Sequence, residues 1–564
     1  MSIFFTPNGS LDVTTDPSDL PENAEQYSMS SGAMQRCKNL RLDESGVAKL
    51  RDGSVEQVDT SGTTMWAVIE QGGVYYSCPG ATIFRNATSL ATGLANKRWS
   101  AIKYNSYNST TQNIFLINGT DRKRIEGSTV TEWGSTAPSA VPVIIAGAST
   151  GLTGDYNVKY TYARKESSTV VYESDPSSAA AAAVTLANQS LSVTWTASAD
   201  SQITHVRVYR TEAGGSTYYH DQDIAIGTLT VDTTTADTAL GTAVATNHDR
   251  PPLGNVVVGP NFNGVCFIVK DNLLYYCLAK QPEYWPTTYY IEVSPPQYPG
   301  KAAIFWNGQL YYLTKQDIYL IQGTGVNTFF PFSQAAITGT QGQLAVEAVA
   351  GHGIYHVGAD GIYLFSNTDK KVTQANFERI FRGETVNGIP GIVRGKLTNS
   401  WLKQYRSKLY FGYADSTETY PSNVLVFDLT TSKSWYYKYP FSIVSVEVDE
   451  TNSRFLAGDT VGIIHEIEKD TKDGSAAISW EIESKDFTLQ TRAHFPRYVK
   501  YDVDASNSTT AIGKVVLDGT VHQNHTLSEN RNVKKRLVAT GNGQRMSLRI
   551  TGSGPVKIYG IEAE

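Results

Sequence analysis

The sequence has few cysteines and no segment suited to a membrane. Four cysteines occur among 564 residues, at positions 37, 78, 266 and 277, and no two of them form the Cys-x-x-Cys pair of many small metal and redox sites. The longest apolar runs fall far short of the roughly 20 residues that a membrane helix requires. The first ten residues, MSIFFTPNGS, lack a basic region and a long apolar core, so we expect no signal peptide.

A strong charge of either sign is also missing. The chain carries 48 lysines and arginines against 54 aspartates and glutamates, for a net charge of −6. The chain as a whole is therefore not a phosphate-binding surface. Hydrophobic residues make up 40% of the sequence, which is enough to build cores and argues against disorder.

Long apolar runs of helical period are absent, whereas 33 tyrosines and 47 glycines are typical of an all-β chain. One stretch reads VAGHGIYHVGADGIYLFS and contains His352, His356 and Asp360. On a strand, residues four apart are separated by roughly 13 Å, which is too far for two ligands of one zinc ion. We therefore predict a hairpin with strands at 353–357 and 362–366 rather than a metal site.

The motif of the first strand, 353–357, is a polar residue or glycine followed by aliphatic and aromatic residues. Similar motifs recur at 272–276, 308–312 and 407–411. Several copies are followed by a short turn and a second apolar strand. Repeats separated by a few dozen residues suit the four-stranded blades of a β-propeller, and no long helical period supports a helical solenoid. The repeats therefore predict a β-propeller.

Two cysteines would face each other across one of these hairpins. Cys266 and Cys277 flank a turn centred on Asp271-Asn272. A disulfide is one alternative, but two buried thiols are favoured for a protein made in a reducing cytoplasm.

Changes in composition divide the chain into five segments. The propeller is interrupted by a region rich in Ala, Ser and Thr, whose alternating apolar residues and central Trp195 predict a small β-sandwich. Such an insertion costs little closure entropy when its ends stay close together. The segments are an N-terminal strand pair and arm (1–60), the first part of the propeller (61–137), the inserted sandwich (138–250), the rest of the propeller (251–470) and a C-terminal β-sandwich (471–564).

Short motifs in this order resemble one known family. The run from Asn39 to Gly53 contains Leu50-Arg51-Asp52-Gly53 and is expected to be a hairpin turning at Glu44-Ser45-Gly46. The motif Gln281-Pro-Glu-Tyr-Trp-Pro286 is expected at the end of a blade, and 546–561 is expected to be a terminal strand pair. Together these motifs resemble the tail nozzle proteins of short-tailed phages, also called packaged-DNA stabilisation proteins or tail tubular protein B.

The inserted sandwich resembles a fibronectin type III module, through Tyr160-Thr-Tyr162, Glu173-Ser-Asp-Pro176 and Val206-Arg-Val-Tyr-Arg210. The family resemblance implies a non-enzymatic structural protein of the virion tail, assembled in the cytoplasm of a bacterial host. It implies a hexameric ring below the portal and adaptor that contacts tail fibre or needle proteins. DNA would pass through the lumen without sequence-specific binding. No catalytic, metal or cofactor-binding residue and no cofactor is implied.

Two other functions stay open at this stage. Propellers also host glycosidases, which need paired carboxylates or a tyrosine nucleophile with an arginine cluster. The acidic residues are scattered and mostly lie in turns, and Arg379 and Arg382 have no third arginine near them in the sequence. The sandwiches also allow a receptor-binding or glycan-binding tail protein.

Three weaker motifs have features of ligand sites. The segment 391–397 (GIVRGKL) resembles a phosphate loop but has the wrong glycine spacing and a leucine in place of the Ser or Thr that holds magnesium. His522 and His525 lie three apart with no cysteine near them, so we expect surface histidines. Asp502 and Asp504 alternate along a strand and offer too few oxygens for calcium.

Overall fold

The computed structural model describes residues 2–25, 28–43, 46–325, 327–373, 376–489, 496–508, 510–527, 531–538 and 543–564. The all-β prediction is confirmed, because strands dominate the described residues, whose helical segments are short: α1 (Glu378–Phe381) and the 3-10 turns Asp237–Ala239 and Arg394–Asn399. No helix in these ranges is long and apolar enough to cross a membrane. The chain forms two compact units: Met1–Ser89, Leu313–Ile318 and Gln334–Glu564 make unit 1, and Leu90–Tyr312 and Tyr319–Ser333 make unit 2.

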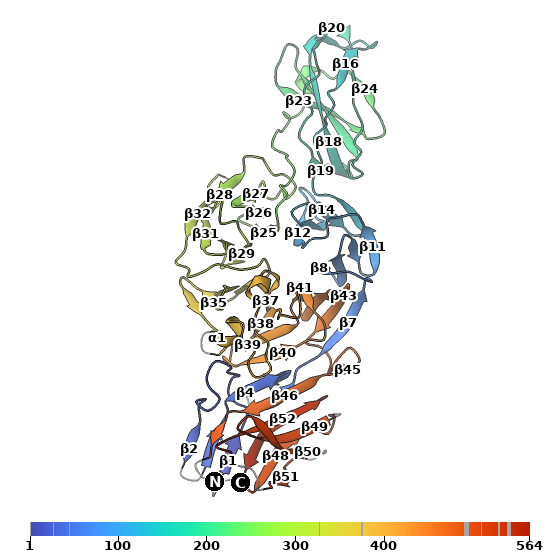
Figure 1. The fold of residues 1–564 in the computed structure, drawn as a ribbon. Coiled ribbons are helices and arrows are strands. Elements are labelled where there is room, and N and C mark those ends of the chain that lie inside the picture. Colours follow the sequence, from blue (N-terminus) through green and yellow to red (C-terminus); the bar gives the residue numbers. More distant parts are fainter. Residues whose placement is uncertain are drawn as a thin grey trace. The chain divides into compact units, whose positions relative to one another are not determined.

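Unit 1 contains a series of antiparallel four-stranded meanders (Figure 1). The first strands of neighbouring meanders contact one another, β33 with β37, β37 with β41 and β41 with β8. Three of these meanders are β8 (Met65–Gln71), β9 (Val74–Pro79), β10 (Ile83–Arg85) and β11 (Thr88–Ala91); β33 (Val346–Val349), β34 (Gly353–Val357), β35 (Ile362–Phe365) and β36 (Asp369–Lys371); and β37 (Trp401–Tyr405), β38 (Lys408–Tyr413), β39 (Asn423–Asp428) and β40 (Ser434–Lys438).

The fourth meander of unit 1 is completed by a strand from far away in the sequence. It consists of β41 (Ile443–Asp449), β42 (Arg454–Asp459) and β43 (Ile463–Ile467), and β7 (Ser54–Asp59) pairs antiparallel with β43. Short strands β44 (Lys472–Asp473) and β45 (Ala476–Ala477) follow on the other side of β7. The N-terminal region therefore supplies an inner strand of a sheet whose other strands lie some four hundred residues later.

A second part of unit 1 joins the two ends of the chain (Figure 1). β1 (Ser2–Phe5) pairs antiparallel with β53 (Lys557–Ala563), so both termini lie in one sheet. The hairpin of β5 (Leu40–Leu42) and β6 (Ala48–Leu50) joins that sheet through β53, whereas its turn residues 44 and 45 lie outside the described residues. The other members of this sheet are β2 (Asn23–Glu25), β3 (Ser28–Ser31), β48 (Tyr498–Asp504) and β51 (Val533–Arg536).

The facing sheet also mixes both ends of the chain. β4 (Met34–Lys38) lies between β40 and β46 (Ser479–Ser484), and the sheet continues through β52, β49 and β50. Buried side chains such as Trp480, Tyr501 and Leu548 belong to the core of unit 1. The remaining strands are β47 (Phe487–Thr488), β49 (Thr510–Leu517), β50 (Thr520–Thr526) and β52 (Arg545–Ser553).

Unit 2 contains three further four-stranded meanders, and their first strands again contact in order, β12 with β25 and β25 with β29. Asn307-Gly308, both with positive φ, form the tight turn between β29 and β30. The strands are β12 (Ser100–Asn105), β13 (Gln112–Ile117), β14 (Arg122–Glu126) and β15 (Thr129–Glu132); β25 (Val256–Asn261), β26 (Val265–Lys270), β27 (Leu273–Tyr276) and β28 (Tyr290–Glu292); and β29 (Ala302–Trp306), β30 (Gln309–Leu313), β31 (Ile318–Gln322) and β32 (Phe330–Ser333).

The repeated motif of the sequence does not mark one fixed position in these sheets. At 308–312, 353–357 and 407–411 it falls on the second strand, but at 272–276 it falls on the third. The motif therefore marks one of the two central strands of a sheet, both of which are largely buried. It does not distinguish the second strand from the third.

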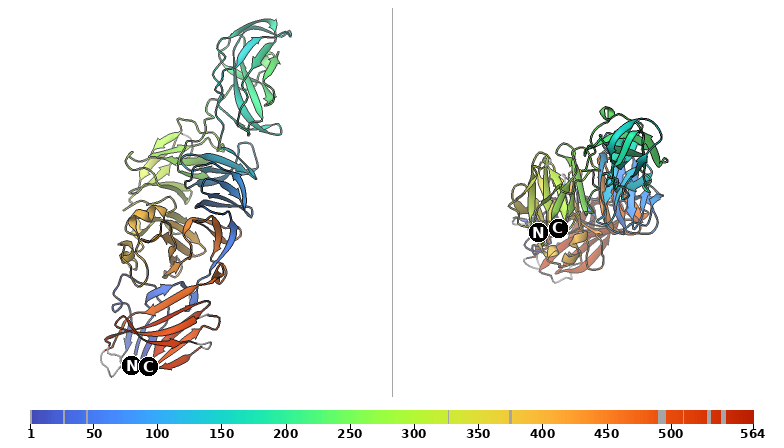
Figure 2. Two further views of the ribbon diagram at one scale, coloured as in Figure 1. Left: turned by 45° about the vertical axis from the view of Figure 1, so that its right-hand side comes forward. Right: turned by 90° about the horizontal axis from the view of Figure 1, so that it is seen from above.

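Residues 143–233 of unit 2 form a β-sandwich (Figure 2). One layer has the order β19-β18-β22-β23, and the strands opposite pair as β16-β21-β24 and β17-β20. Tyr160, Leu191, Val193, Trp195 and Val208 are buried between them. The strands are β16 (Val143–Ala146), β17 (Leu152–Tyr156), β18 (Val158–Glu166), β19 (Thr169–Glu173), β20 (Val184–Gln189), β21 (Leu191–Thr194), β22 (His205–Thr211), β23 (Tyr218–Ala225) and β24 (Thr230–Thr233).

Candidate functional site

His356 lies on β34 of the predicted hairpin, which is confirmed as β34 and β35, whereas His352 lies in the turn just before β34. His356 is fully buried; its Nδ1 lies 3.0 Å from the carbonyl oxygen of Gly339 and its Nε2 lies 2.9 Å from Oδ1 of Asp369. The exposed His352 contacts the Tyr355 hydroxyl. The two histidines therefore bind different partners and do not face each other across a common site. Within the described ranges no group of three or more His, Cys, Asp or Glu side chains could hold a metal ion.

The loop that resembles a phosphate site has a structural role. Lys396 Nζ donates hydrogen bonds to the carbonyl oxygens of Asp415 (2.8 Å) and Glu418. Its ammonium group therefore ties the 3-10 turn Arg394–Asn399 to the loop after β38. The two arginines nearby are also engaged, Arg379 with Glu384 and Arg382 with Glu378.

The prediction of two surface histidines near the C-terminus is wrong for one of them. His525 lies on strand β50, where it is 7% exposed, and its Nδ1 lies 3.0 Å from the Tyr501 hydroxyl. The alternation of β50 places His525 on the covered face of its sheet, which the polar local sequence does not reveal. Asp502, on β48, pairs with Arg531 through both carboxylate oxygens.

All four cysteines are free and buried, which agrees with the thiol alternative for Cys266 and Cys277. The backbone N–H of Cys266 donates a hydrogen bond to Cys277 Sγ at 3.0 Å. Burial raises the pKa of the Cys266 thiol, so this side chain is not a reactive thiolate at neutral pH.

The N-terminal motif assembles around a fully buried arginine. The guanidinium of Arg51 is 0% exposed and donates from Nη1 and Nη2 to the two carboxylate oxygens of Asp473, at 3.1 and 2.5 Å. Its Nε donates to Oδ1 of Asn39, and its remaining hydrogen bonds go to the carbonyl oxygens of Asp52 and Lys438. The guanidinium carbon also lies 4.3 Å from the centre of the Tyr439 ring.

The neighbours of Arg51 explain the other residues of the motif. Asn39 adopts a left-handed conformation (φ 56°), which asparagine tolerates, and its Nδ2 donates to the Ser479 carbonyl oxygen. A Cβ on Gly53 would lie 1.9 Å from the Lys472 carbonyl oxygen, so only glycine fits there. Burial raises the pKa of the nearby Glu468. This motif joins the N-terminal hairpin, β40 and the start of the C-terminal region.

The second motif, 281–286, attaches the inserted sandwich to the meanders of unit 2. The Tyr284 hydroxyl accepts a hydrogen bond from the backbone N–H of Glu173 in the sandwich, and the Tyr284 ring stacks on His248 at 4.0 Å. The indole N–H groups of Trp133 and Trp285 both donate to the carbonyl oxygen of Pro282. The aromatic residues of this motif therefore lie where the inserted sandwich contacts the meanders of unit 2. We call this contact region the root of the insertion; the sequence alone did not indicate it.

An ion pair crosses the same root. Arg164, on β18 of the sandwich, lies 2.5 Å from Oε1 of Glu283, and their side chains are 7% and 2% exposed. Ser106, at the end of β12, donates to the same carboxylate oxygen, and Gln202 accepts a hydrogen bond from Arg164. A charge pair of this burial is satisfied only when the sandwich and the meander keep their positions.

Two carboxyl groups meet here, Asp175 from the segment after β19 and Asp249 from the segment that leads to β25. Asp175 and Asp249 share a hydrogen bond between their side chains, and the backbone N–H of His248 donates to Asp175 at 2.9 Å. Burial, followed by the charge of Asp249, raises the pKa of Asp175 to about 6. Burial lowers the pKa of His248. The pair is therefore stable when it shares a proton and is weakened when both carboxyl groups are ionised.

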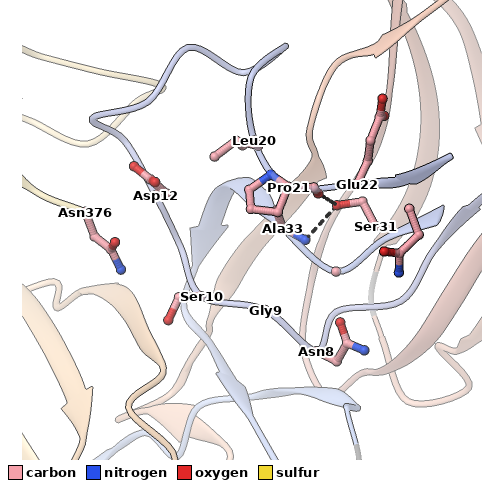
Figure 3. Close-up of a pocket in the computed structure, with 12 residues that line it drawn as sticks. Asn8, Gly9, Ser10, Asp12, Leu20, Pro21, Glu22, Ser31, Ala33 and Asn376 are labelled. Atoms are coloured by element: carbon pink, nitrogen blue, oxygen red, sulfur yellow. Dashed lines mark hydrogen bonds between the residues drawn. The ribbon is translucent and has the colours of Figure 1, made fainter. Parts of the chain in front are cut away.

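A cavity of about 360 Å³ lies beside the N-terminal segment of unit 1 (Figure 3). Several of its polar groups are engaged within the chain: Ser31 Oγ donates to the Pro21 carbonyl oxygen and accepts from the Ala33 N–H. The Asp12 carboxylate accepts from two backbone N–H groups and a threonine hydroxyl. Its lining residues include the carboxylates Asp12 and Glu22, and none of them is a lysine, arginine, histidine or cysteine.

No protein-family profile and no curated protein matches the sequence. Among solved structures, the crystal structure of the computationally designed Ika8 protein is similar over 73% of this chain and 99% of that chain, with 10% identity and a TM-score of 0.34. BBS1N, solved in complex with ARL6DN, is similar over 74% of this chain and 98% of that chain, with 8% identity and a TM-score of 0.25. At these TM-scores neither likeness carries an argument about function.

Proposed function

We propose that the protein is a non-enzymatic structural component of a phage tail, a nozzle subunit that forms a ring below the portal and adaptor. In this role it retains packaged DNA and lets it pass at ejection. The motifs around Arg51 and Tyr284, which carry the resemblance to nozzle proteins, support the proposal. Both motifs form buried hydrogen bonds between segments that are distant in the sequence. Such contacts are expected of residues that hold a structural protein together rather than catalyse a reaction.

The observation that carries the architectural part is the pairing of β7 with β43. A β-propeller can be closed in this way, by a strand from one end of the chain that completes the sheet formed by the other end. The four-stranded meanders of the described chain would be its blades. We propose that the insertion is a fibronectin type III-like module and that β1, β4 and β6 complete the C-terminal sandwich.

Electron microscopy of the purified full-length chain, alone and with the upstream adaptor, tests the proposal. A closed ring with a central hole, stacked on the adaptor, is expected. A monomer that cleaves oligosaccharides would contradict it and would favour a propeller glycosidase.

The inserted sandwich would project away from the channel, because a module of this size would block DNA. Deleting residues 138–250 and joining the ends should then leave ring formation intact. Collapse of the ring in this variant, while the chain still folds, would show that the insertion belongs to the subunit interface.

A receptor- or glycan-binding tail protein is the second candidate. Aromatic side chains on outermost strands favour it: Tyr290 on β28 and Phe330 on β32 are 46% and 51% exposed, and these strands contact each other. Exposed aromatic rings can stack on sugars. Binding to a glycan array that is lost on replacing both residues by serine would support this candidate over the nozzle.

A further inference from the structure

A second cavity of unit 1, of about 520 Å³, lies between two neighbouring meanders. One wall is formed by His352, Tyr355 and residues 370–372 of the meander β33–β36. The other wall is formed by Leu409 and by residues from the end of β39 and the turn after it, 427–429 and Ser432. This volume lies within the range of about 300–1,000 Å³ that is usual for ligand pockets.

The interior of this cavity is apolar. Leu409 is fully buried and Tyr355 is 6% exposed, whereas Val372, Phe427 and Leu429 are only partly buried. Edge-to-face packing against Phe377, with centroids 5.7 Å apart, holds the Phe427 ring in place. Covering the remaining apolar surface would contribute about 25 cal/mol per Å², so a large apolar side chain is a favourable occupant.

The rim carries charged groups of both signs. Lys371 is neutralised by Asp360 at 2.9 Å, and the Asp428 carboxylate is occupied by the backbone N–H groups of Thr430 and Thr431. Lys370 is exposed, and its ammonium group has no acidic partner in the described part of the chain. An anionic group beside the apolar occupant would therefore be attracted to Lys370.

An unpaired strand edge runs beside the cavity. Among the described strands β36 pairs only with β35, as the last strand of its sheet. Its other edge presents backbone N–H and C=O groups that an extended segment of another chain can bind, as in β-strand addition. This edge favours a peptide over a small molecule, which would use the apolar interior alone.

We propose that this cavity and the open edge of β36 form a docking site for an extended segment of a partner protein. The segment places one large apolar side chain against Phe427 and Leu429 and an acidic side chain beside Lys370. The proposal does not depend on the ring or on the nozzle function, because it uses only contacts within unit 1.

The test uses the full-length chain and the probe 8-anilinonaphthalene-1-sulfonate, an apolar aromatic anion that becomes fluorescent when bound. Lys370→Glu should weaken its binding about tenfold, equivalent to 1.4 kcal/mol, and Leu429→Lys should abolish it. The matched control is Lys315→Glu, which reverses an exposed lysine outside the cavity and should leave binding unchanged. Equal binding by all four proteins, each shown to be folded by circular dichroism, would overturn the proposal.

Displacement of the probe then distinguishes a peptide from a small ligand. The hexapeptide Ser-Gly-Phe-Asp-Glu-Gly should displace it, whereas versions with Ala in place of Phe, or with Lys in place of both acids, should not. If no peptide displaces the probe, or if all three do so equally, the site does not recognise the proposed segment. Because Lys370 is exposed, its variant keeps the test valid even if Leu429→Lys fails to fold.

Discussion

Replacing Arg51 by methionine tests a fully buried charge of unit 1. Methionine keeps most of the apolar stem but removes the guanidinium, whose donors reach Asp473, Asn39 and two carbonyl oxygens. The Asp473 side chain is only 7% exposed, so the substitution leaves an uncompensated carboxylate in the protein interior.

The expected cost follows from that geometry. Removing one partner of a buried ion pair destabilises a protein by about 3–5 kcal/mol, and the two hydrogen bonds to Asp473 place Arg51 within that range. A loss of about 4 kcal/mol lowers the ratio of folded to unfolded protein about a thousandfold. For a unit of this size it should lower the melting temperature by roughly 8 °C, at about 2 °C per kcal/mol.

Scanning calorimetry of the full-length chain measures this shift. Arg382→Met is the matched control, because Arg382 forms an exposed ion pair with Glu378 that contributes only about 0.3–0.5 kcal/mol. The double variant Arg51→Met/Asp473→Leu should recover most of the loss, since it leaves no charge unpaired. A shift for Arg51→Met no larger than that of the control would refute the reasoning.

Three further predictions concern other buried contacts. Glu283→Ala leaves Arg164 unpaired at the root of the insertion and should destabilise unit 2 by about 3–5 kcal/mol. Proteolysis between the sandwich and the meanders should become faster. Glu283→Gln should destabilise the unit less, and equal effects of the two variants would argue against a charge effect. Gly53→Ala forces a backbone shift and should cost about 1–3 kcal/mol in urea unfolding, and unchanged stability would refute the close approach. The raised pKa of Asp175 implies stability that is fully present below its unfolded pKa near 3.8 and is lost as the pH rises through about 6. Asp249→Asn should therefore flatten the melting temperature between pH 4 and 7 relative to the wild type, and parallel profiles would show that the two carboxyl groups are not coupled.

Local pattern was a good guide to the strands and a poor guide to their partners. The hairpin around Asp360 was predictable because alternating β-formers and a tight turn specify one another within about a dozen residues. His525 was misassigned because its burial depends on the layer that covers β50, about which the adjacent residues carry no information. The roles of Glu283 and Tyr284 were missed for the same reason, since their partners Arg164 and Glu173 lie more than a hundred residues away.

The amino-acid sequence by itself determined the all-β class and individual hairpins such as β34–β35, because side-chain alternation and turn chemistry act over a few residues. Only the tertiary structure decided that β7 completes the sheet of β41–β43 and that the two ends of the chain share one sheet. It also decided that Arg51 is buried against Asp473. These pairings join segments several hundred residues apart, and their energy comes from burial and hydrogen bonds that exist only when the whole chain has folded.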